Sequence, residues 1–440
     1  MYSALAKHWT LDPAMTFLNH GSFGACPRAI LELQRRLRDR MEAEPVRFMA
    51  RELEDLLDAS RTALADLIHA DPASVVFVHN ATDGVNAVLR SMHFRSGDEL
   101  LVTNHAYGAC RNVMDFVARE AGARVVAAEV PFPLRAADEV MEAVLGKVTP
   151  RTRLAMLDHV TSPTGIIFPI HQLVQALGEK GVDTLVDGAH GPGMLPLDME
   201  EIGAAYYTGN CHKWLCAPKG AGFVYVRSDK ASEIHPSCIS HGYSSPRAGR
   251  SVLHTNFDWV GTIDPTPWLC VGECVRWCDS LMPGGIAALM RHNHDLALRG
   301  RRILCEALGV EEPCPADLIG SLAAVPIPAG AKMPFAEKED FPRDPMHDLL
   351  FEEYRIEIPV GFWPAPPQRL VRISAQAYNT EEQYKRLAEA LREILARGTA
   401  EGARRKTQGA APLAARADFS SRDAGFRSGS SGSKNVYSIL

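Results

Sequence analysis

The chain has 440 residues, enough for one large and one smaller domain that each bury a core. Its apolar content of 46%, charged content of 23% and net charge of −6 are typical of a soluble globular protein and give no basis for binding nucleic acid. No apolar run reaches the ~20 residues that a membrane-spanning helix needs, and the N-terminus lacks the pattern of a secretory signal. Ten cysteines without paired spacing favour reduced thiols, so we expect a cytoplasmic protein without membrane association.

Strands and helices are expected to alternate along most of the chain. Residues 1–25 form an N-terminal segment, and Pro27 opens an amphipathic helix whose apolar face carries Ile30, Leu33 and Leu37. Helical stretches then separate short apolar runs that are typical of buried strands, at Val75–Val78, Glu99–Thr103, Arg124–Ala128, Leu154–Leu157, Thr184–Val186, Ala205–Thr208 and Phe223–Val226. This alternation predicts an α/β fold with a mainly parallel sheet covered by helices on both faces.

Two domains and a tail are expected. The large domain should span residues 26–285, and a smaller C-terminal α/β domain should span 286–400. The smaller domain should contain strands near Leu318–Val325 and Leu370–Ser374 and a last helix from Glu381 to Arg397. Residues 403–440 are poor in bulky apolar groups and rich in Ser, Gly, Ala and Arg, so we predict a disordered tail.

The stretch Leu185–Val226 carries the strongest chemical signal. An apolar run ends in Asp187, and a buried strand with a carboxylate at its carboxyl end is how open α/β sheets present a site. Lys213 follows the next strand, among apolar and aromatic neighbours that disfavour its ammonium form and lower its pKa. Pyridoxal phosphate requires these two groups, because the lysine bonds the cofactor and the acid keeps its pyridine nitrogen protonated.

The sequence around these two residues resembles the class V aminotransferase family of fold-type I pyridoxal-phosphate enzymes. The matching motifs are Asp187-Gly188-Ala189-His190, Tyr207-Thr208-Gly209-Asn210-Cys211-His212-Lys213-Trp214 and Ala217-Pro218-Lys219-Gly220. Over residues 15–395, the chain looks most like the branch of isopenicillin N epimerases and related carbon–sulfur lyases. The resemblance implies a seven-stranded sheet with one antiparallel strand, a pyridoxal 5′-phosphate cofactor, a small amino-acid substrate and a homodimer.

The resemblance implies a set of residues that hold the cofactor's phosphate. Ala81 and Thr82 begin a helix directly after a buried strand, where free backbone N–H groups attract an anion. Asn210 and His212, beside the lysine, match further phosphate contacts. Thr262 resembles a threonine that reaches the phosphate from the partner subunit, which is the basis for expecting a homodimer.

Other residues are implied to contact the cofactor's ring. His190 and His159 match positions near its phenolic oxygen. Either His105 or Tyr107 is implied to stack on the ring and to handle protons, and the sequence leaves both open. Lys213 is the expected proton carrier on one face of the substrate, since it is freed when the substrate binds.

Substrate contacts are implied at three positions. Arg372 lies on a strand with apolar flanks and matches the family's arginine that holds an α-carboxylate through two hydrogen bonds. Arg47 is a second carboxylate candidate, and Asn19 belongs to a segment that resembles the epimerase-like branch. The 356–369 segment contains no cysteine, whereas cysteine desulfurases carry a nucleophilic cysteine on the corresponding loop, so a persulfide mechanism is not expected.

Several reactions remain open from the sequence. Amino-acid epimerisation, elimination of a sulfur group from Cβ and transfer of the nitrogen all begin with loss of the α-proton. A relative that only binds a partner is a further alternative, which the presence of Lys213, Asp187 and Arg372 disfavours. Cys270 and Cys274, with Cys278, share one helix face, but no further ligands accompany them, so we expect core packing and no metal site.

Overall fold

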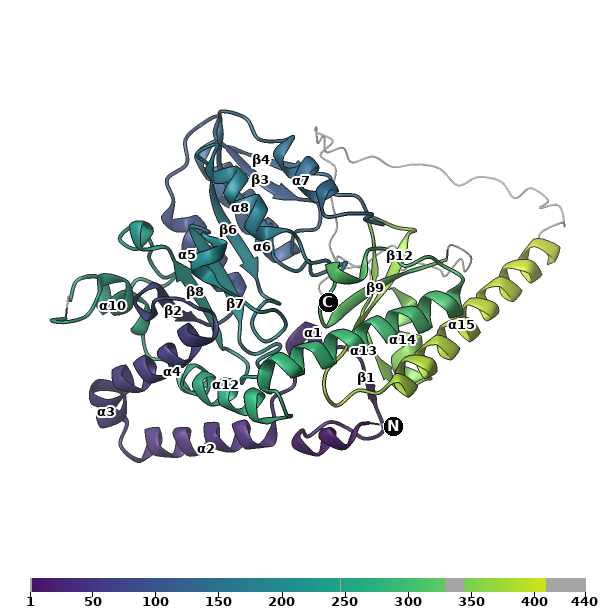
Figure 1. The fold of residues 1–440 in the computed structure, drawn as a ribbon, viewed down its shortest axis with the longest axis horizontal. Coiled ribbons are helices and arrows are strands. Elements are labelled where there is room, and N and C mark those ends of the chain that lie inside the picture. The colour runs from purple at the N-terminus through teal and green to yellow at the C-terminus, as the bar shows by residue number, and fades with distance from the viewer. Residues whose placement is uncertain (1, 246, 329–343, 409–440) are drawn as a thin grey trace, which may run out of the picture.

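A seven-stranded sheet with the order β2-β8-β7-β6-β5-β3-β4 forms the centre of the protein (Figure 1). The computed structural model describes residues 2–245, 247–328 and 344–408. β8 runs antiparallel to both of its neighbours and the other pairs are parallel, which confirms the predicted mainly parallel sheet. The strands are β2 (Val75–Val78), β3 (Glu99–Thr103), β4 (Arg124–Ala128), β5 (Thr152–Asp158), β6 (Asp183–Gly188), β7 (Tyr206–Asn210) and β8 (Gly222–Val226).

Helices cover both faces of this sheet, and the strand side chains alternate between them. On β2, Val76 and Val78 pack in the apolar cluster with α5 (Ala81–Ser91) and α6 (Gly108–Ala121). Val75 and Phe77 pack in the opposite cluster with α4 (Leu53–Leu67) and α8 (Ile170–Gly178). Burial on both faces is the reason that the strand sequences are apolar throughout rather than alternating.

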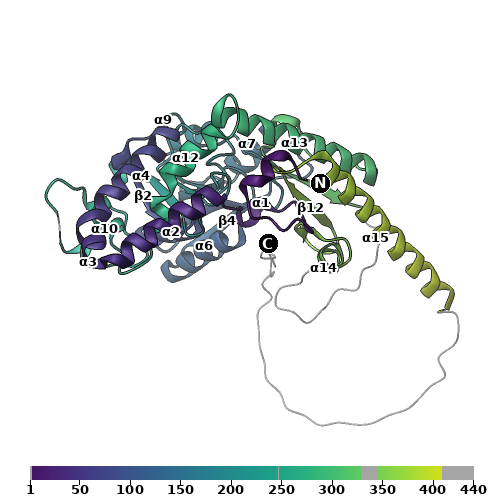
Figure 2. The same ribbon diagram turned by 90° about the horizontal axis from the view of Figure 1, so that it is seen from below.

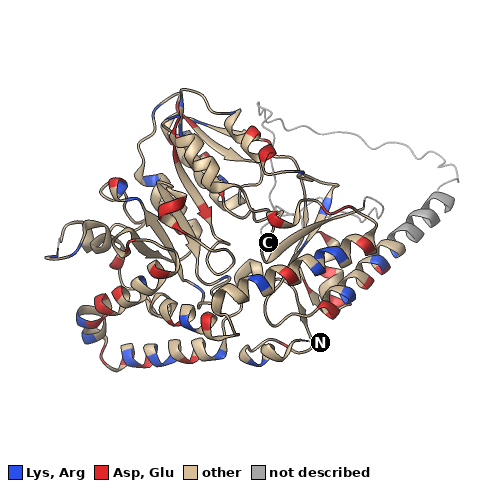
Figure 3. Ribbon diagram, in the orientation of Figure 1, with Lys and Arg blue, Asp and Glu red and all other residues tan. Residues whose placement is uncertain are grey.

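The remaining helices around the large sheet are mostly short and lie outside it. Basic and acidic residues are interspersed along outer helices such as α2, whereas the central strands contain few charged residues (Figure 3). These helices are α1 (His20–Phe23), α2 (Arg28–Ala43), α3 (Pro45–Arg47), α7 (Asp138–Leu145), α9 (Met199–Ile202), α10 (Val252–Asp258), α11 (Thr266–Leu269) and α12 (Val271–Ser280).

A smaller antiparallel sheet with the order β11-β12-β9 follows in the C-terminal part. It consists of β9 (Leu322–Ile327), β11 (Val360–Phe362) and β12 (Arg369–Ser374), and the helices beside it are α13 (Gly285–Leu308), α14 (Pro345–Glu352) and α15 (Glu381–Gln408). α15 continues past the predicted end at Arg397, because residues 398–408 are mostly good helix formers. Residues 403–408 are therefore helical, and the rest of the predicted tail, 409–440, lies outside the described residues.

The N-terminal segment is joined to the smaller sheet. β1 (Thr16–Phe17) pairs in parallel with β10 (Ile356–Glu357), and the Ser374 N–H donates to the Leu18 carbonyl at 3.0 Å. The N-terminus lies beside this part of the chain in two perpendicular views (Figures 1 and 2). Within the described ranges, no helix combines the length and apolar character needed to cross a bilayer.

Candidate active site

A cavity of about 470 Å³ opens at the carboxyl edge of the large sheet. Asp158 on β5 pairs directly with Asp187 on β6, and Asp187 pairs with Thr208 on β7, so these strand ends reach the same edge. The residues lining the cavity come from six segments of the chain and are Ser22, Phe23, His79, Asn80, Ala81, Thr82, Tyr107, Asp158, Val160, Ser162, Asp187, Ala189, His190, Asn210, His212, Lys213, Lys219 and Gly220.

The N-terminal segment forms hydrogen bonds with the loop that follows β7 and carries Lys213. Nε2 of His20 lies 2.9 Å from the Lys213 carbonyl oxygen, and Nζ of Lys219 donates to the Gly24 carbonyl at 2.9 Å. Gly24 has a φ of 70°, and a Cβ there would lie 2.0 Å from the His212 carbonyl oxygen. Only glycine fits this close approach between the two segments.

Trp214, His190 and Lys213 form a directed chain of hydrogen bonds. The indole Nε1–H of Trp214 donates to Nδ1 of His190 at 3.3 Å, and Nε2 of His190 lies 3.1 Å from Nζ of Lys213. Burial and the Lys213 charge lower the pKa of His190 well below its usual value, so the ring is neutral. A neutral ring that accepts at Nδ1 carries its proton on Nε2, so the amine of Lys213 is the acceptor of the second bond.

Electrostatics favour the neutral form of Lys213 that this chain of bonds requires. Burial and the nearby Arg372 charge lower the pKa of Lys213 to about 7, against the opposing effect of Asp187. The amine is therefore substantially unprotonated at neutral pH. An unprotonated lysine in a cavity can act as a nucleophile or as a proton acceptor.

Asp187 is a buried carboxylate with two hydrogen-bond donors. It accepts from the Cys110 thiol at 3.1 Å and from the Ala189 backbone N–H at 3.0 Å. Burial and the Asp187 charge raise the pKa of the adjacent Asp158 well above its usual range. The Asp158 carboxyl therefore favours its protonated form, because burial and a neighbouring negative charge both oppose its ionisation.

The N-terminus of α5 lies on another side of the cavity. Asn80 caps the helix by accepting from the Asp83 N–H at 2.9 Å, and the Asn210 side chain accepts from the Ala81 N–H at 2.8 Å. Thr82 adds a hydroxyl to the lining, and the helix dipole makes this end favourable for an anion. Asn210 thus contributes by holding the helix terminus in place.

His212 and Lys219 border the same part of the cavity. Nδ1 of His212 lies 3.0 Å from the Ala221 carbonyl oxygen, which accepts its proton and fixes the ring. Burial, with the charges of Lys213 and Lys219, lowers the pKa of His212 to about 4. A helix N-terminus beside the ammonium group of Lys219 suits an anionic group such as a phosphate.

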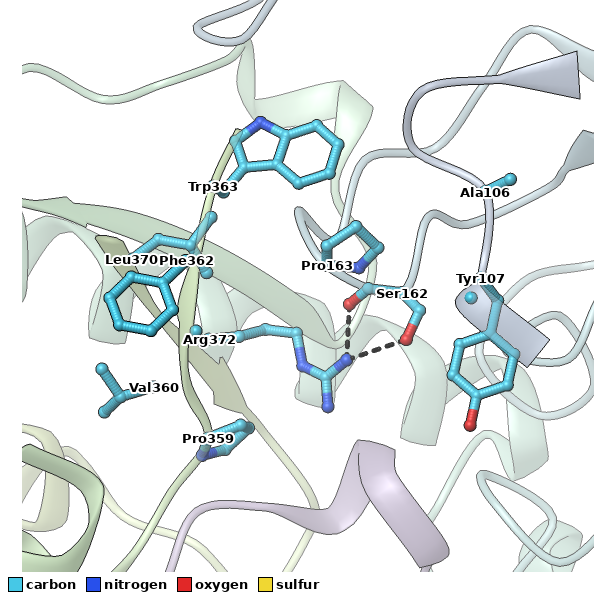
Figure 4. Close-up of a pocket in the computed structure, with 12 residues that line it drawn as sticks. Ala106, Tyr107, Ser162, Pro163, Pro359, Val360, Phe362, Trp363, Leu370 and Arg372 are labelled. Atoms are coloured by element: carbon cyan, nitrogen blue, oxygen red, sulfur yellow. Dashed lines mark hydrogen bonds between the residues drawn. The ribbon is translucent and has the colours of Figure 1, made fainter. Parts of the chain in front are cut away.

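Arg372 lies beside the cavity on β12. Its Nη1 donates to the carbonyl oxygen of Ser162 at 2.5 Å and to the Ser162 hydroxyl at 3.2 Å (Figure 4). Its Nη2 donates to the Ser22 hydroxyl at 3.1 Å, while its Nε is buried without a hydrogen-bond partner among the described residues. Burial lowers the pKa of Arg372 to about 10, which leaves the guanidinium charged at neutral pH. The edge formed by Nε and Nη2 can therefore receive a carboxylate.

Tyr107 lines the cavity, whereas His105 does not. His105 is fully buried, with Nδ1 at 2.8 Å from the Thr164 hydroxyl, Nε2 at 3.1 Å from the Val130 carbonyl, and its ring centroid 4.5 Å from that of Trp363. Tyr107 caps the N-terminus of α6 and lines the lysine cavity. Of the two alternatives that the sequence leaves open, the structure brings only Tyr107 to the cavity.

His159 also lies away from the cavity, in contrast to its expected place near the cofactor. Its Nδ1 lies 2.9 Å from the Tyr207 hydroxyl. Neighbouring residues of an extended segment point in opposite directions, so Asp158, Val160 and Ser162 line the cavity and His159 turns away.

Three further predicted residues lie outside the cavity in this chain. Arg47 on α3 is 68% exposed and pairs with Glu52 at 2.7 Å. Asn19 donates to Glu357 at 2.9 Å and accepts from the Ser22 hydroxyl at 2.5 Å, so its link to the site runs through Ser22. Thr262 lies on an exposed loop between α10 and α11, and its contact with a partner subunit stays a prediction.

Four further residues contribute to this site although they were not predicted as site residues from the sequence: Asp158, Ser22, Ser162 and Trp214. A signal for Asp158 was present, because it ends a buried run one strand before Asp187 and parallel neighbours present such ends together. Ser22 and Ser162 gave no local signal, since they matter only as partners of Arg372.

Comparisons with known proteins point to one family. Residues 25–328 match the family described as aminotransferase class-V. Isopenicillin N epimerase of Amycolatopsis lactamdurans is 36% identical over 399 residues, which cover 88% of this chain and 96% of that protein. The probable L-cysteine desulfhydrase, chloroplastic, of Arabidopsis thaliana is 33% identical over 411 residues, which cover 88% of this chain and 84% of that protein.

Solved structures share the fold. A C-DES mutant with glycine covalently linked to its PLP cofactor has a TM-score of 0.70 at 22% identity, over 86% of this chain and 96% of that chain. The cysteine desulfurase CsdA from Escherichia coli also has a TM-score of 0.70 at 22% identity, over 88% of this chain and 97% of that chain.

Proposed function

This chain belongs to the class V aminotransferase family, and we propose that it is a pyridoxal-phosphate enzyme acting at Cα or Cβ of a free α-amino acid. The observation that carries the proposal is the position of Lys213. Its Nζ accepts from His190 at 3.1 Å, its pKa is lowered to about 7, and it lines the same cavity as Asp187. A neutral amine and a buried carboxylate in one cavity are the groups that bind the two reactive ends of this cofactor.

The lining residues fit the cofactor in charge and hydrogen-bonding capacity. Lys213 would hold its aldehyde carbon, Asp187 its pyridine nitrogen and His190 its ring oxygen. The N-terminus of α5, with Ala81, Thr82, Asn210 and His212, would hold its phosphate, and Tyr107 would lie against its ring. We further infer that Thr262 of a second copy completes the phosphate site in a homodimer. When bound, the cofactor supplies an electron-withdrawing ring that stabilises negative charge at Cα.

Two residues of this chain can exchange protons with the substrate. Lys213 is a substantially neutral amine at neutral pH, so its Nζ can accept the proton from Cα. Burial raises the pKa of Tyr107, so its hydroxyl keeps its proton and can donate. A proton acceptor and a proton donor in one cavity are what reprotonation with inversion needs, and they support epimerisation as the reaction.

Carbon–sulfur lysis is the alternative reaction. It is favoured by the likeness to the desulfhydrase of Arabidopsis thaliana at 33% identity, close to the 36% found for the epimerase. Aminotransfer uses the same early proton loss and is a further alternative. A relative that only binds a partner is disfavoured by the joint arrangement of Lys213, Asp187 and Arg372. The cytoplasmic location stays a prediction.

Incubation of the holoenzyme with amino acids in heavy water tests the proposal. Deuterium at Cα with inversion and without pyruvate supports epimerisation. Pyruvate and ammonia released from cysteine derivatives support the lyase, and a product amino acid formed from an added oxo acid supports aminotransfer. The absence of exchange, elimination and transfer with every amino acid contradicts an activity at Cα or Cβ. Tyr107→Phe should keep exchange but lose inversion.

A further inference from the structure

A second cavity adjoins the lysine cavity on the side of the smaller sheet. Tyr107 and Ser162 line both cavities, so the two spaces meet at these residues. Arg372 borders the second cavity from β12. A substrate whose carboxylate is held by Arg372 and whose reacting carbon faces Lys213 therefore has its side chain next to this space.

Apolar side chains form most of the wall of this second cavity. Its described lining includes Ala106, Pro163, Pro359, Trp363 and Leu370. Among the described lining residues, only Arg372 carries a charge. A charged side chain of the substrate would lose its hydration there without gaining an opposite charge, because Arg372 is occupied by the α-carboxylate.

The wall has a defined shape because the smaller sheet holds it. Leu370 is paired with Gly361 on β11 and lies on the same face of this sheet as Arg372, two residues further along β12, whereas Phe362 is paired with Arg369 on the opposite face. Trp363 is buried and packs with Leu370 and Ala324, and its ring contacts His105. His105, which the sequence implied at the cofactor, thus supports the wall of this cavity.

Arg372 is oriented so that one edge remains for a ligand. Figure 4 shows its guanidinium extending toward Ser162, to which Nη1 is bonded, with Tyr107 beyond Ser162. Pro163 and Trp363 lie along the same space. The Nε atom has no partner among the described residues, so a carboxylate can bind through Nε and Nη2.

We propose that this second cavity is the side-chain pocket of the enzyme and that it selects α-amino acids with a neutral, apolar side chain longer than that of cysteine. The inference rests on the proposed function and deepens it. A cysteine side chain has one carbon and would leave the wall at Leu370 and Trp363 without contacts. Each further buried CH₂ removes apolar surface from water and tightens binding about fourfold.

Equilibrium binding to the holoenzyme tests the proposal. We would titrate L-alanine, L-norvaline, L-norleucine, L-cysteine, L-glutamate and L-lysine, and follow the absorbance of the bound cofactor and the heat of binding. L-Norleucine should bind about 60-fold more tightly than L-alanine if its three added CH₂ groups are fully buried. L-Glutamate and L-lysine should bind more weakly than L-norleucine.

The outcomes separate this proposal from the proposed function. Affinities that do not rise with side-chain length, or a charged side chain that binds more tightly than L-norleucine, would overturn the pocket while leaving an amino-acid enzyme. A holoenzyme whose absorbance and heat respond to none of these amino acids would overturn the proposed function and the pocket together.

Substitutions test whether the dependence of affinity on side-chain length arises at the wall of the second cavity. Leu370→Ala should weaken L-norleucine binding by about tenfold and leave L-alanine binding unchanged, because only the longer side chain reaches residue 370. Phe116→Ala is the matched control, since Phe116 is 42% exposed on α6 and lines neither cavity. Equal losses for both ligands, or the same loss in Phe116→Ala, would contradict the pocket. The titrations of the unmodified protein decide the question even if Leu370→Ala does not fold.

Discussion

Nζ of Lys213 lies 3.1 Å from Nε2 of His190, and the direction of this bond is set from the far side of the imidazole ring. Trp214 can only donate, so Nδ1 of His190 must accept, and the ring proton points at the lysine. If Nζ of Lys213 were protonated, its N–H groups would face the Nε2–H of His190, and two donors cannot form a hydrogen bond. The arrangement therefore favours the neutral amine, in the same direction as the burial that lowers the pKa of Lys213 to about 7.

The first prediction concerns the reactivity of Lys213 in the cofactor-free protein. Amine reagents attack only the neutral form, so labelling of Lys213 should rise with pH to half of its maximum near pH 7 and then level off. Lys230 is the internal comparison, because Asp183 raises its pKa and its labelling should still increase above pH 10. Mass spectrometry of labelled peptides gives both curves, and a Lys213 curve that follows that of Lys230 would contradict the prediction.

The second prediction concerns Trp214. Trp214→Phe removes the donor to Nδ1, so His190 can move its proton there and accept from an ammonium at Nε2. The midpoint of Lys213 labelling should rise by roughly one to two pH units, the range expected for a hydrogen bond to a charged group. Trp259→Phe is the control and should leave the midpoint unchanged, because Trp259 lies at the C-terminal end of α10 and does not line the lysine cavity. An unchanged midpoint in Trp214→Phe would show that Trp214 does not act through His190.

The third prediction concerns cofactor attachment. Lys213→Ala should abolish the visible absorption band of the purified protein, because no other side chain would bond the cofactor. Lys230→Ala should keep the band, since that lysine pairs with Asp183 at 2.6 Å on the surface. Circular dichroism should show that both variants are folded. An unchanged band in Lys213→Ala would remove this lysine from the proposal.

The fourth prediction concerns Asp187. Asp187→Asn keeps the shape of the side chain but removes the charge of the Asp158–Asp187 pair, so turnover should fall by about 10²–10³-fold and cofactor should be lost more readily. Asp183→Asn, at the other end of β6, should change turnover little, because its ion pairs with Arg227 and Lys230 are at the surface. Steady-state rates and cofactor content give the comparison, and near-normal turnover of Asp187→Asn would refute the role of this carboxylate.

The fifth prediction concerns assembly. If Thr262 completes the phosphate site of a second copy, light scattering should give twice the mass of the chain, and dilution should release cofactor together with dissociation. Thr262→Ala should retain the cofactor less tightly without unfolding, because Thr262 is exposed within its own chain. A stable monomer that retains the cofactor tightly would exclude a shared site.

The sequence by itself determined the fold class and two chemical groups of the site. Buried strands flanked by helices are recognisable as apolar runs, and seven such runs became the seven strands of the large sheet. Asp187 and Lys213 are recognisable for a similar reason, because Asp187 lies at the end of a strand, Lys213 follows a strand, and the local neighbours of each already describe its environment. These properties depend on residues that are close in the chain.

Only the tertiary structure decided which face each side chain presents and which distant residues meet. His159 turns away while Asp158 lines the cavity, because one residue of shift in an extended segment reverses direction. His105 packs on Trp363, which is 258 residues later in the chain, and leaves Tyr107 at the cavity. Arg372 is oriented by Ser22 and Ser162, which lie 350 and 210 residues away in the sequence. Such contacts are set by how the elements pack against one another, and no local pattern encodes them.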